Sequence, residues 1–164
     1  PMKMAATSSR RAQLMNVLRA HGVGGQVTDE EILDAAYERN EETVKELLEK
    51  GGNPRAKHPK THQDLLFYAA MGGGTEIVRV LLSDHGVDPN TSNKWGDVPL
   101  HAAAGRGYYE IVRLLLDHGA IPDRSNCDKC TPLSEAEAKN HHDTAKLLLE
   151  ATKTSRDIRR QETE

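Results

Sequence analysis

The chain repeats itself at a spacing of 33 residues, and this recurrence constrains the fold more than any other feature. The run 99–101, Pro-Leu-His, returns at 132–134 as Pro-Leu-Ser, and the apolar run 111–116 returns at 144–149. A unit of this length cannot bury its own apolar face, so several copies must stack on one another to be stable. The recurrence therefore predicts an elongated array of similar units.

Two more copies lie upstream of these two. Leu66 lies 34 positions before Leu100, and the alanine pair 35–36 lies 68 positions before the pair 103–104. The second copy contains one extra residue between Leu82 and Gly86. Its spacing to the third copy is therefore 34 residues before that point and 33 after it. The sequence therefore predicts about four repeats, over roughly residues 28–57, 58–92, 93–125 and 126–152.

A recurrence of this length with a Pro99-Leu100-His101-x-Ala103 core resembles the ankyrin repeat, over roughly residues 28–152. The resemblance implies an all-α solenoid of stacked helix pairs, in which a short β-hairpin finger follows each pair. Repeat 1 lacks the Pro-Leu-His core and repeat 4 has Ser134 in place of the histidine. Such departures are typical of the end repeats of an array.

Repeat 3 gives the clearest prediction of helix boundaries. We expect a first helix over about 100–105, with Pro99 near its start and with Gly105 and Gly107 at its end. We expect a second helix over 109–117, closed by a positive φ at Gly119.

The ends of the chain lie outside the repeats. Residues 1–27 are expected to form an N-terminal helix and a linker, because Leu14, Val17 and Leu18 have helical spacing within 9–20. Residues 153–164 form a charged tail, and from Thr152 onward we expect a frayed helix or disorder.

Composition excludes several classes of protein. No apolar run approaches the ~18 residues that a membrane span needs, and the N-terminus shows no secretory signal. Two cysteines are too few for a disulfide framework, which favours a reducing compartment, the cytoplasm or the nucleus. We expect a monomer.

The resemblance implies a binding module that has no catalytic activity, no cofactor and no small-molecule substrate. Such a protein binds a protein partner through a concave surface of finger tips and first-helix faces, as an adaptor, an inhibitor or a chaperone. The register assigns eight candidate partner-binding residues: Tyr37, Met71, Lys94, Trp95, Asp97, Arg106, Asp128 and Lys139. Trp95 is the only tryptophan, and two interpretations of it stay open: contact with a partner, or packing across the finger.

Charge is distributed unevenly along the chain. Residues 28–50 contain nine acidic and three basic side chains. This favours a partner with a basic patch, although a simple solvated helix face explains the same pattern.

His101 is the residue that most invites a catalytic interpretation. In ankyrin repeats the histidine at this position is a buried hydrogen-bonding residue that ties neighbouring loops, with help from a threonine three positions earlier. Here that position holds Val98, so we expect one of the bonds to be missing. The triple glycine 72–74 has no Gly-Lys-Ser/Thr ending and does not indicate a phosphate loop.

Cys127-Asp128-Lys129-Cys130 supports an alternative function that depends on a metal or on thiol redox chemistry. A structural zinc site needs four ligands, and a single pair supplies two. His141 and His142 follow in the sequence, but adjacent helical residues point ~100° apart.

Two further hypotheses concern single features of the sequence. The termini are basic, so contact with nucleic acid is an alternative through Arg10, Arg11, Arg156, Arg159 and Arg160. Asn90 lies two positions after Asp88, similar to the finger asparagine that asparaginyl hydroxylases modify in animal ankyrin domains, so it is a candidate hydroxylation site.

Overall fold

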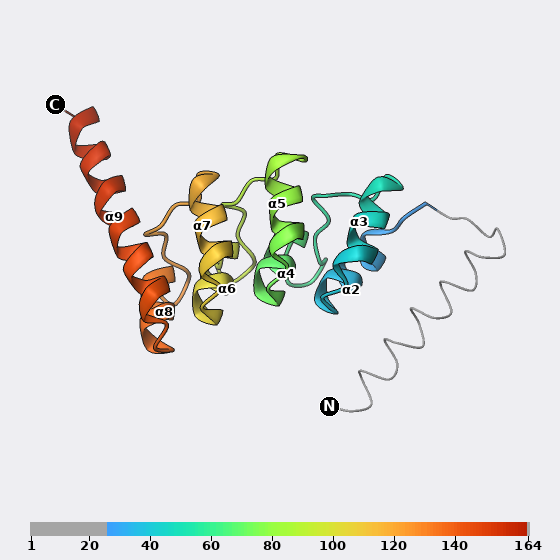
Figure 1. The fold of residues 1–164 in the computed structure, drawn as a ribbon, viewed down its shortest axis with the longest axis horizontal. Helices are drawn as coiled ribbons and strands as arrows, with labels where there is room; N and C mark the ends of the chain where they lie inside the picture. Colours follow the sequence, from blue (N-terminus) through green and yellow to red (C-terminus); the bar gives the residue numbers. More distant parts are fainter. Residues whose placement is uncertain (1–25, 164) are drawn as a thin grey trace.

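The computed structural model describes residues 26–163, which form four helix pairs stacked in one row (Figure 1). The predicted all-α repeat stack is confirmed. The helices are α2 (Asp29–Tyr37), α3 (Glu41–Glu49), α4 (Leu65–Gly72), α5 (Thr75–Ser83), α6 (Pro99–Arg106), α7 (Tyr109–Asp117), α8 (Pro132–Ala138) and α9 (His142–Glu162). The predicted N-terminal helix over 9–20 lies outside the described residues.

The two predicted helices of repeat 3 are both present. The second, α7, has the expected bounds, and Gly119 follows it with φ +91°. The first, α6, begins at Pro99 and continues through Gly105 to Arg106. Gly107 alone ends α6, because it is the residue with left-handed backbone, at φ +70°.

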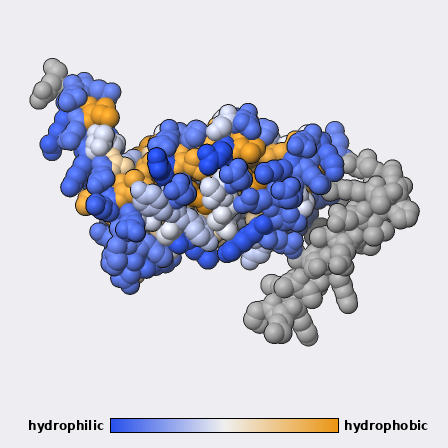
Figure 2. Space-filling model, in the orientation of Figure 1, coloured by the Kyte–Doolittle hydropathy of each residue, from blue (hydrophilic) through white to orange (hydrophobic). Residues whose placement is uncertain are grey.

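The core runs through the whole stack because each helix pair buries apolar side chains against the next pair. The first helix of each repeat contributes small residues to this core. Ala70 and Ala104 are fully buried, and their small size lets neighbouring helices approach closely. Leucines fill the space between the two helix layers, and Leu66, Leu100 and Leu115 are fully buried. In Figure 2 a hydrophobic band crosses the region of α5 and α7 between hydrophilic borders, in accord with the half-buried residues packed on the core there: Val80, Leu114 and Leu116.

Left-handed backbone recurs with the repeats. One such residue follows the first helix of every repeat: Arg39, Gly73, Gly107 and Asn140. A second set lies in the fingers: His62, Gly96 and Lys129. A third closes the second helices: Gly51, Gly86 and Gly119. The backbone therefore keeps its register even where the sequence has no glycine.

The expected frayed or disordered tail after Thr152 is not what the structure shows, because α9 continues to Glu162. Thr152 occupies the register position of Gly119, and without a glycine the chain does not turn there. The Thr152 hydroxyl is buried and donates to the Leu148 carbonyl at 2.8 Å. None of the helices within 26–163 combines the length and apolarity needed to cross a membrane.

Side chains of the continued helix also hold it against the stack. The Arg159 guanidinium lies 2.9 Å from the Asp123 carboxylate, and that of Arg156 lies 3.9 Å from it. Asp123 belongs to the loop after α7, so repeat 3 anchors the end of α9.

The fingers are closed turns, and residues 26–163 contain no β-strand. One isolated antiparallel bridge joins Lys57 and Asp64 at the first finger. In the second finger the Asn93 amide donates to the Asp97 carbonyl at 2.9 Å, and the Asn93 side-chain oxygen accepts from the Trp95 and Asp97 amides. An asparagine thus closes the loop in place of the expected hairpin ladder.

Candidate partner-binding surface

The first helices α2, α4, α6 and α8 pack side by side and present equivalent positions in a row. One row contains Tyr37, Met71, Gly105 and Ala138. The next contains Glu38, Gly72, Arg106 and Lys139. The surface is therefore aromatic and acidic at repeat 1 and basic at repeats 3 and 4. At Gly72 and Gly105 it carries no side chain.

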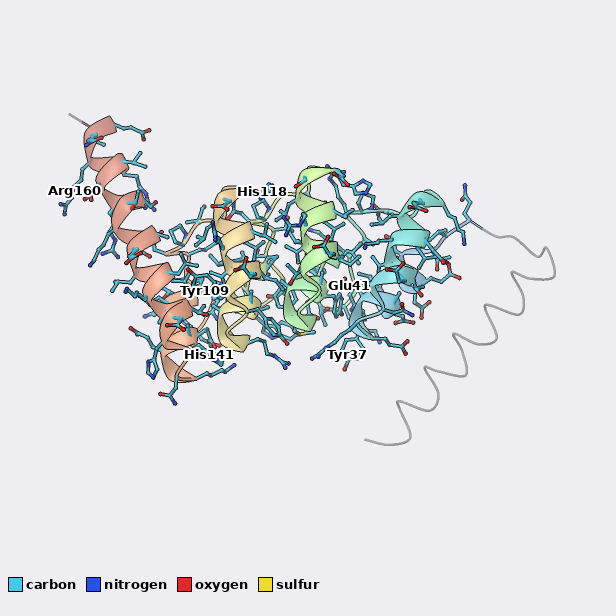
Figure 3. All side chains as sticks on the ribbon, viewed as in Figure 1. Tyr37, Glu41, Tyr109, His118, His141 and Arg160 are labelled. Carbon is cyan, nitrogen blue, oxygen red and sulfur yellow. The ribbon has the colours of Figure 1, made fainter. Side chains whose placement is uncertain are left out.

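Tyr37 is the most exposed large apolar side chain of this row, with 67% of its surface accessible. Its ring packs edge-on against Tyr68, with ring centroids 6.1 Å apart. Tyr68 is buried, and burial raises the pKa of its hydroxyl above the usual value. Figure 3 shows Tyr37 at the edge of the stack, near the end of α2. Tyr68 supports the exposed ring, and sequence reasoning missed it because repeat 3 has Ala102 at that position.

Trp95 lies at the tip of the middle finger and is 45% exposed. The Lys94 ammonium stands 4.5 Å from the centroid of its ring, within cation–π range. The Trp95 carbonyl accepts a hydrogen bond from the Cys127 amide of the next finger at 2.9 Å. The backbone of Trp95 is thus fixed while nearly half of its side chain faces solvent.

Two of the other candidate side chains contact a neighbouring side chain, and the remaining ones differ in exposure. Asp97 accepts a 2.7 Å hydrogen bond from the Asn126 amide group, so its carboxylate links two fingers. Lys139 lies 3.8 Å from Glu135. Arg106 and Asp128 are exposed, and Met71 is half-buried.

Comparison with known proteins identifies the repeats. The sequence pattern for ankyrin repeats in three copies matches residues 32–126 and, in a second register, 66–160. The chain belongs to the ankyrin repeat family. A protein of Rickettsia bellii (strain RML369-C) named "Putative ankyrin repeat protein" is 38% identical over 61 residues. That match covers 37% of this chain and only 7% of the relative's length. Ankyrin repeats are generally protein–protein interaction modules, and the family is generally non-catalytic.

His101 has the structural role that the ankyrin pattern predicts. It is buried, its Nδ1 accepts from the Val98 amide at 3.1 Å, and its Nε2 donates to the Cys130 carbonyl at 3.0 Å. Burial lowers the pKa of the imidazole, which favours the neutral form that this pair of bonds requires. Val98 has no hydroxyl to cap α6, so the bond expected to be missing is missing, whereas both bonds of the His101 ring are in place.

The cysteines of this ankyrin chain lie on the third finger. Cys127 is exposed and Cys130 is half-buried. Between residues 26 and 163, no three or more His, Cys, Asp or Glu side chains lie close enough to hold a metal ion. His141 packs instead over Gly107, at the start of α9 (Figure 3).

Asn90 links two ankyrin repeats through its side chain. Its Nδ2 donates to the Gly119 carbonyl at 3.0 Å, and its Oδ1 accepts from the Ile121 amide at 2.9 Å. Hydroxylation of Asn90 stays a prediction, on a side chain whose amide group is already hydrogen-bonded.

The basic termini are only partly described. Arg156 and Arg159 contact Asp123, and Arg160 is exposed near the free end of α9 (Figure 3). Arg10 and Arg11 lie outside the described residues.

Proposed function

We propose that this protein binds a protein partner on the surface formed by its first helices and finger tips. Three exposed side chains support the proposal most: Tyr37, Trp95 and Arg106. Aromatic residues and arginine contribute most of the binding energy at protein interfaces when they become buried. The backbone of these residues lies on helices and turns that the stack already holds in place. Binding therefore does not have to order the backbone, which lowers its entropic cost.

The proposed mode of action is occupation of the partner's surface, as an adaptor, an inhibitor or a chaperone. The protein then needs no reacting group of its own. We further propose that it works as a monomer in the cytoplasm or the nucleus. Sedimentation equilibrium of the free protein tests the monomer, and a mass twice that of the chain contradicts it.

The surface of repeat 1 favours a partner segment with basic residues. Asp34 lies on the same helix, α2, as Tyr37, Glu38 directly follows that helix, and all three side chains are exposed. A lysine or arginine from a partner gains both from the ring face and from the carboxylates. The proposal therefore predicts that affinity falls as salt rises from low to physiological concentration.

Affinity capture from the source cells tests the binding surface. The wild type is compared with a Trp95→Ala, Arg106→Ala double variant, and bound proteins are identified by mass spectrometry. A protein that the wild type retains and the variant loses supports the proposed surface. Equal recovery contradicts it.

Tyr37→Ala extends the test to repeat 1, and the matched control is Tyr109→Ala. Tyr109 is also an exposed tyrosine, 40% accessible, but it lies on the second helix α7. We expect Tyr37→Ala to weaken binding of the captured partner by about tenfold or more, as truncation of an interface anchor does. We expect Tyr109→Ala to leave binding unchanged. Equal losses would mean that the partner does not distinguish the two helix layers.

A further inference from the structure

Cys127 and Cys130 lie on one tight turn, in the finger between α7 and α8. The Asn126 amide donates to the Cys130 carbonyl at 3.0 Å, and the Cys130 amide donates to the Asn126 side-chain oxygen at 2.9 Å. The Lys129 amide donates to the Asn126 carbonyl at 3.1 Å. Asn126 and Cys130 therefore face each other across the mouth of the loop, and Cys127 directly follows Asn126.

This geometry keeps the two cysteines on one closed loop. The ends of the hydrogen-bonded turn, Asn126 and Lys129, lie less than about 7 Å apart, and each cysteine directly follows one of them. A disulfide needs Cα atoms within about 7 Å of each other, a separation that two intervening residues on a folded-back turn allow. The Cys130 Sγ also lies 3.8 Å from the Asp128 carbonyl, so this thiol is turned toward the loop that joins the two cysteines.

The two thiols differ in access to solvent. Cys127 is exposed, whereas Cys130 is half-buried. An accessible thiol reacts first with an oxidant, and a less accessible neighbour then resolves the intermediate. The pair thus has one cysteine suited to each step.

We propose that Cys127 and Cys130 form a reversible disulfide site, oxidised by a small disulfide such as oxidised glutathione. The Cys127 thiolate attacks one sulfur of glutathione disulfide, and a mixed disulfide forms as the first glutathione leaves as a thiolate. The Cys130 thiolate then attacks the Cys127 sulfur, and the second glutathione leaves. The protein loses two electrons and two protons, and one glutathione disulfide becomes two glutathione thiols.

The disulfide acts on the proposed partner-binding surface through the backbone. The Cys127 amide donates to the Trp95 carbonyl at 2.9 Å, and the Cys130 carbonyl accepts from His101 at 3.0 Å. Both cysteines therefore carry bonds to repeat 3, and oxidation fixes the loop that positions Trp95. This consequence rests on the proposed function, whereas formation of the disulfide does not.

Intact mass spectrometry tests the site on the full chain without any partner. The protein is equilibrated in buffers with different ratios of reduced to oxidised glutathione, quenched with acid, and alkylated at its remaining thiols. We expect a species lighter than the reduced protein by two hydrogen atoms, which takes up no alkylating agent and returns to the reduced form with dithiothreitol. Wild type that yields only glutathione adducts, at every ratio, overturns the proposal.

Single serine variants separate the two steps. Cys130→Ser stops at the mixed disulfide on Cys127, and Cys127→Ser leaves only the half-buried thiol. We expect glutathione to add to the Cys130→Ser variant about tenfold faster, because its thiol is more accessible. Equal rates contradict the assigned order of attack.

The effect on the surface has its own measurement. Affinity for the captured partner is compared between reduced and oxidised wild type, with the Cys127→Ser, Cys130→Ser double variant as control. A change in the wild type that the double variant does not show supports the regulatory role. A disulfide that forms and leaves affinity unchanged overturns that role and leaves the disulfide site intact.

Discussion

The middle finger, residues 93–97, meets a neighbour on each side, and the two junctions are held differently. At the first junction, with finger 58–63, the Lys94 amide donates to the Thr61 carbonyl at 3.0 Å. At the second junction, with finger 126–130, the Cys127 amide makes the equivalent bond to Trp95 at 2.9 Å. The main-chain link is thus common to both.

The side chains add bonds only at the second junction. There Asp97 accepts from Asn126, and His101 donates to Cys130. The equivalent residues at the first junction are Gln63, Asn93 and Phe67. The Gln63 side-chain oxygen accepts from the Thr61 hydroxyl instead, and the buried Asn93 Nδ2 has no hydrogen-bond partner. The backbone of the repeat is therefore compatible with very different numbers of side-chain links.

Because only one junction has side-chain links, we expect stability to be distributed unevenly along the stack. In a repeat array, stability is approximately a sum of repeat and neighbour terms, so a weak junction opens before a strong one. We infer that the first junction opens more readily than the second. Hydrogen exchange is the direct comparison: the Lys94 amide should exchange faster than the Cys127 amide.

The largest expected effect comes from making the second junction resemble the first. His101→Phe introduces the residue of repeat 2 and leaves the buried Val98 amide without an acceptor, whereas the Cys130 carbonyl loses one bond and keeps the one from the Asn126 amide. An unsatisfied buried amide costs about 1–3 kcal/mol and a lost hydrogen bond about 1 kcal/mol, so we expect a loss of about 3 kcal/mol in the free energy of unfolding. Urea denaturation measures it. A loss below about 1 kcal/mol would mean that the ring does not tie the junction.

The entrance to α4 carries the next largest effect. Asp64 is 3% exposed, and its Oδ1 accepts from the Phe67 amide at 2.8 Å. Desolvation by burial raises the pKa of this carboxyl from 3.8 to about 6. The folded state therefore binds the proton more tightly than the unfolded state. The resulting stabilisation is complete below pH 3.8 and is lost as the pH rises through about 6.

Asp64→Thr removes this buried charge and keeps an acceptor, as Thr131 does at the equivalent position of α8, where it accepts from the Ser134 amide. We expect the variant to be more stable than the wild type by about 2 kcal/mol at pH 7.5, with the difference shrinking toward pH 4. Unfolding free energies across that range provide the measurement. A difference that does not change with pH would assign it to packing and not to ionisation.

The repeat period was sufficient to predict the helix pairs, because it encodes the apolar faces that must stack. It also placed α7 correctly, and the resemblance to the ankyrin repeat gave His101 its structural role. The left-handed backbone at Arg39, His62 and Lys129 was not predictable from residue type, because none of them is glycine, the residue that adopts it without steric cost. The continuation of α9 did leave a signal, the missing glycine at Thr152, but the charged composition of the tail obscured it.

The proposed partner-binding surface was predictable only in part. Register alone placed Tyr37, Trp95 and Arg106 at exposed positions. It did not distinguish Asp97, whose partner Asn126 belongs to the next finger, or reveal the support that Tyr68 gives to Tyr37. These contacts depend on which side chains occupy the neighbouring repeat, and a single repeat does not specify them.

Exchanging the acceptors of the two junctions should produce smaller effects of opposite sign. Asp97→Gln removes a charge-assisted bond to Asn126, and we expect it to cost about 1.5 kcal/mol. Gln63→Asp offers the Asn93 Nδ2 the acceptor that it lacks, and we expect a gain of about 1 kcal/mol. Thermal and urea unfolding of both variants measure the pair. Destabilisation by Gln63→Asp would show that the first junction has no room for the bond of the second.

The smallest effects should be the same at the two outer fingers. His62 and Lys129 occupy one register position in left-handed backbone, at φ +59° and +63°, where the middle finger has Gly96. Glycine relieves the backbone strain but gives the unfolded chain more freedom, so we expect His62→Gly and Lys129→Gly each to stabilise by about 0.5 kcal/mol. Gly96→Ala is the reciprocal control and should destabilise, because a Cβ there lies 3.1 Å from the Cys127 amide nitrogen. Equal small gains from urea denaturation would confine the difference between the junctions to their side-chain hydrogen bonds, whereas a gain at only one finger would show that their backbones also differ.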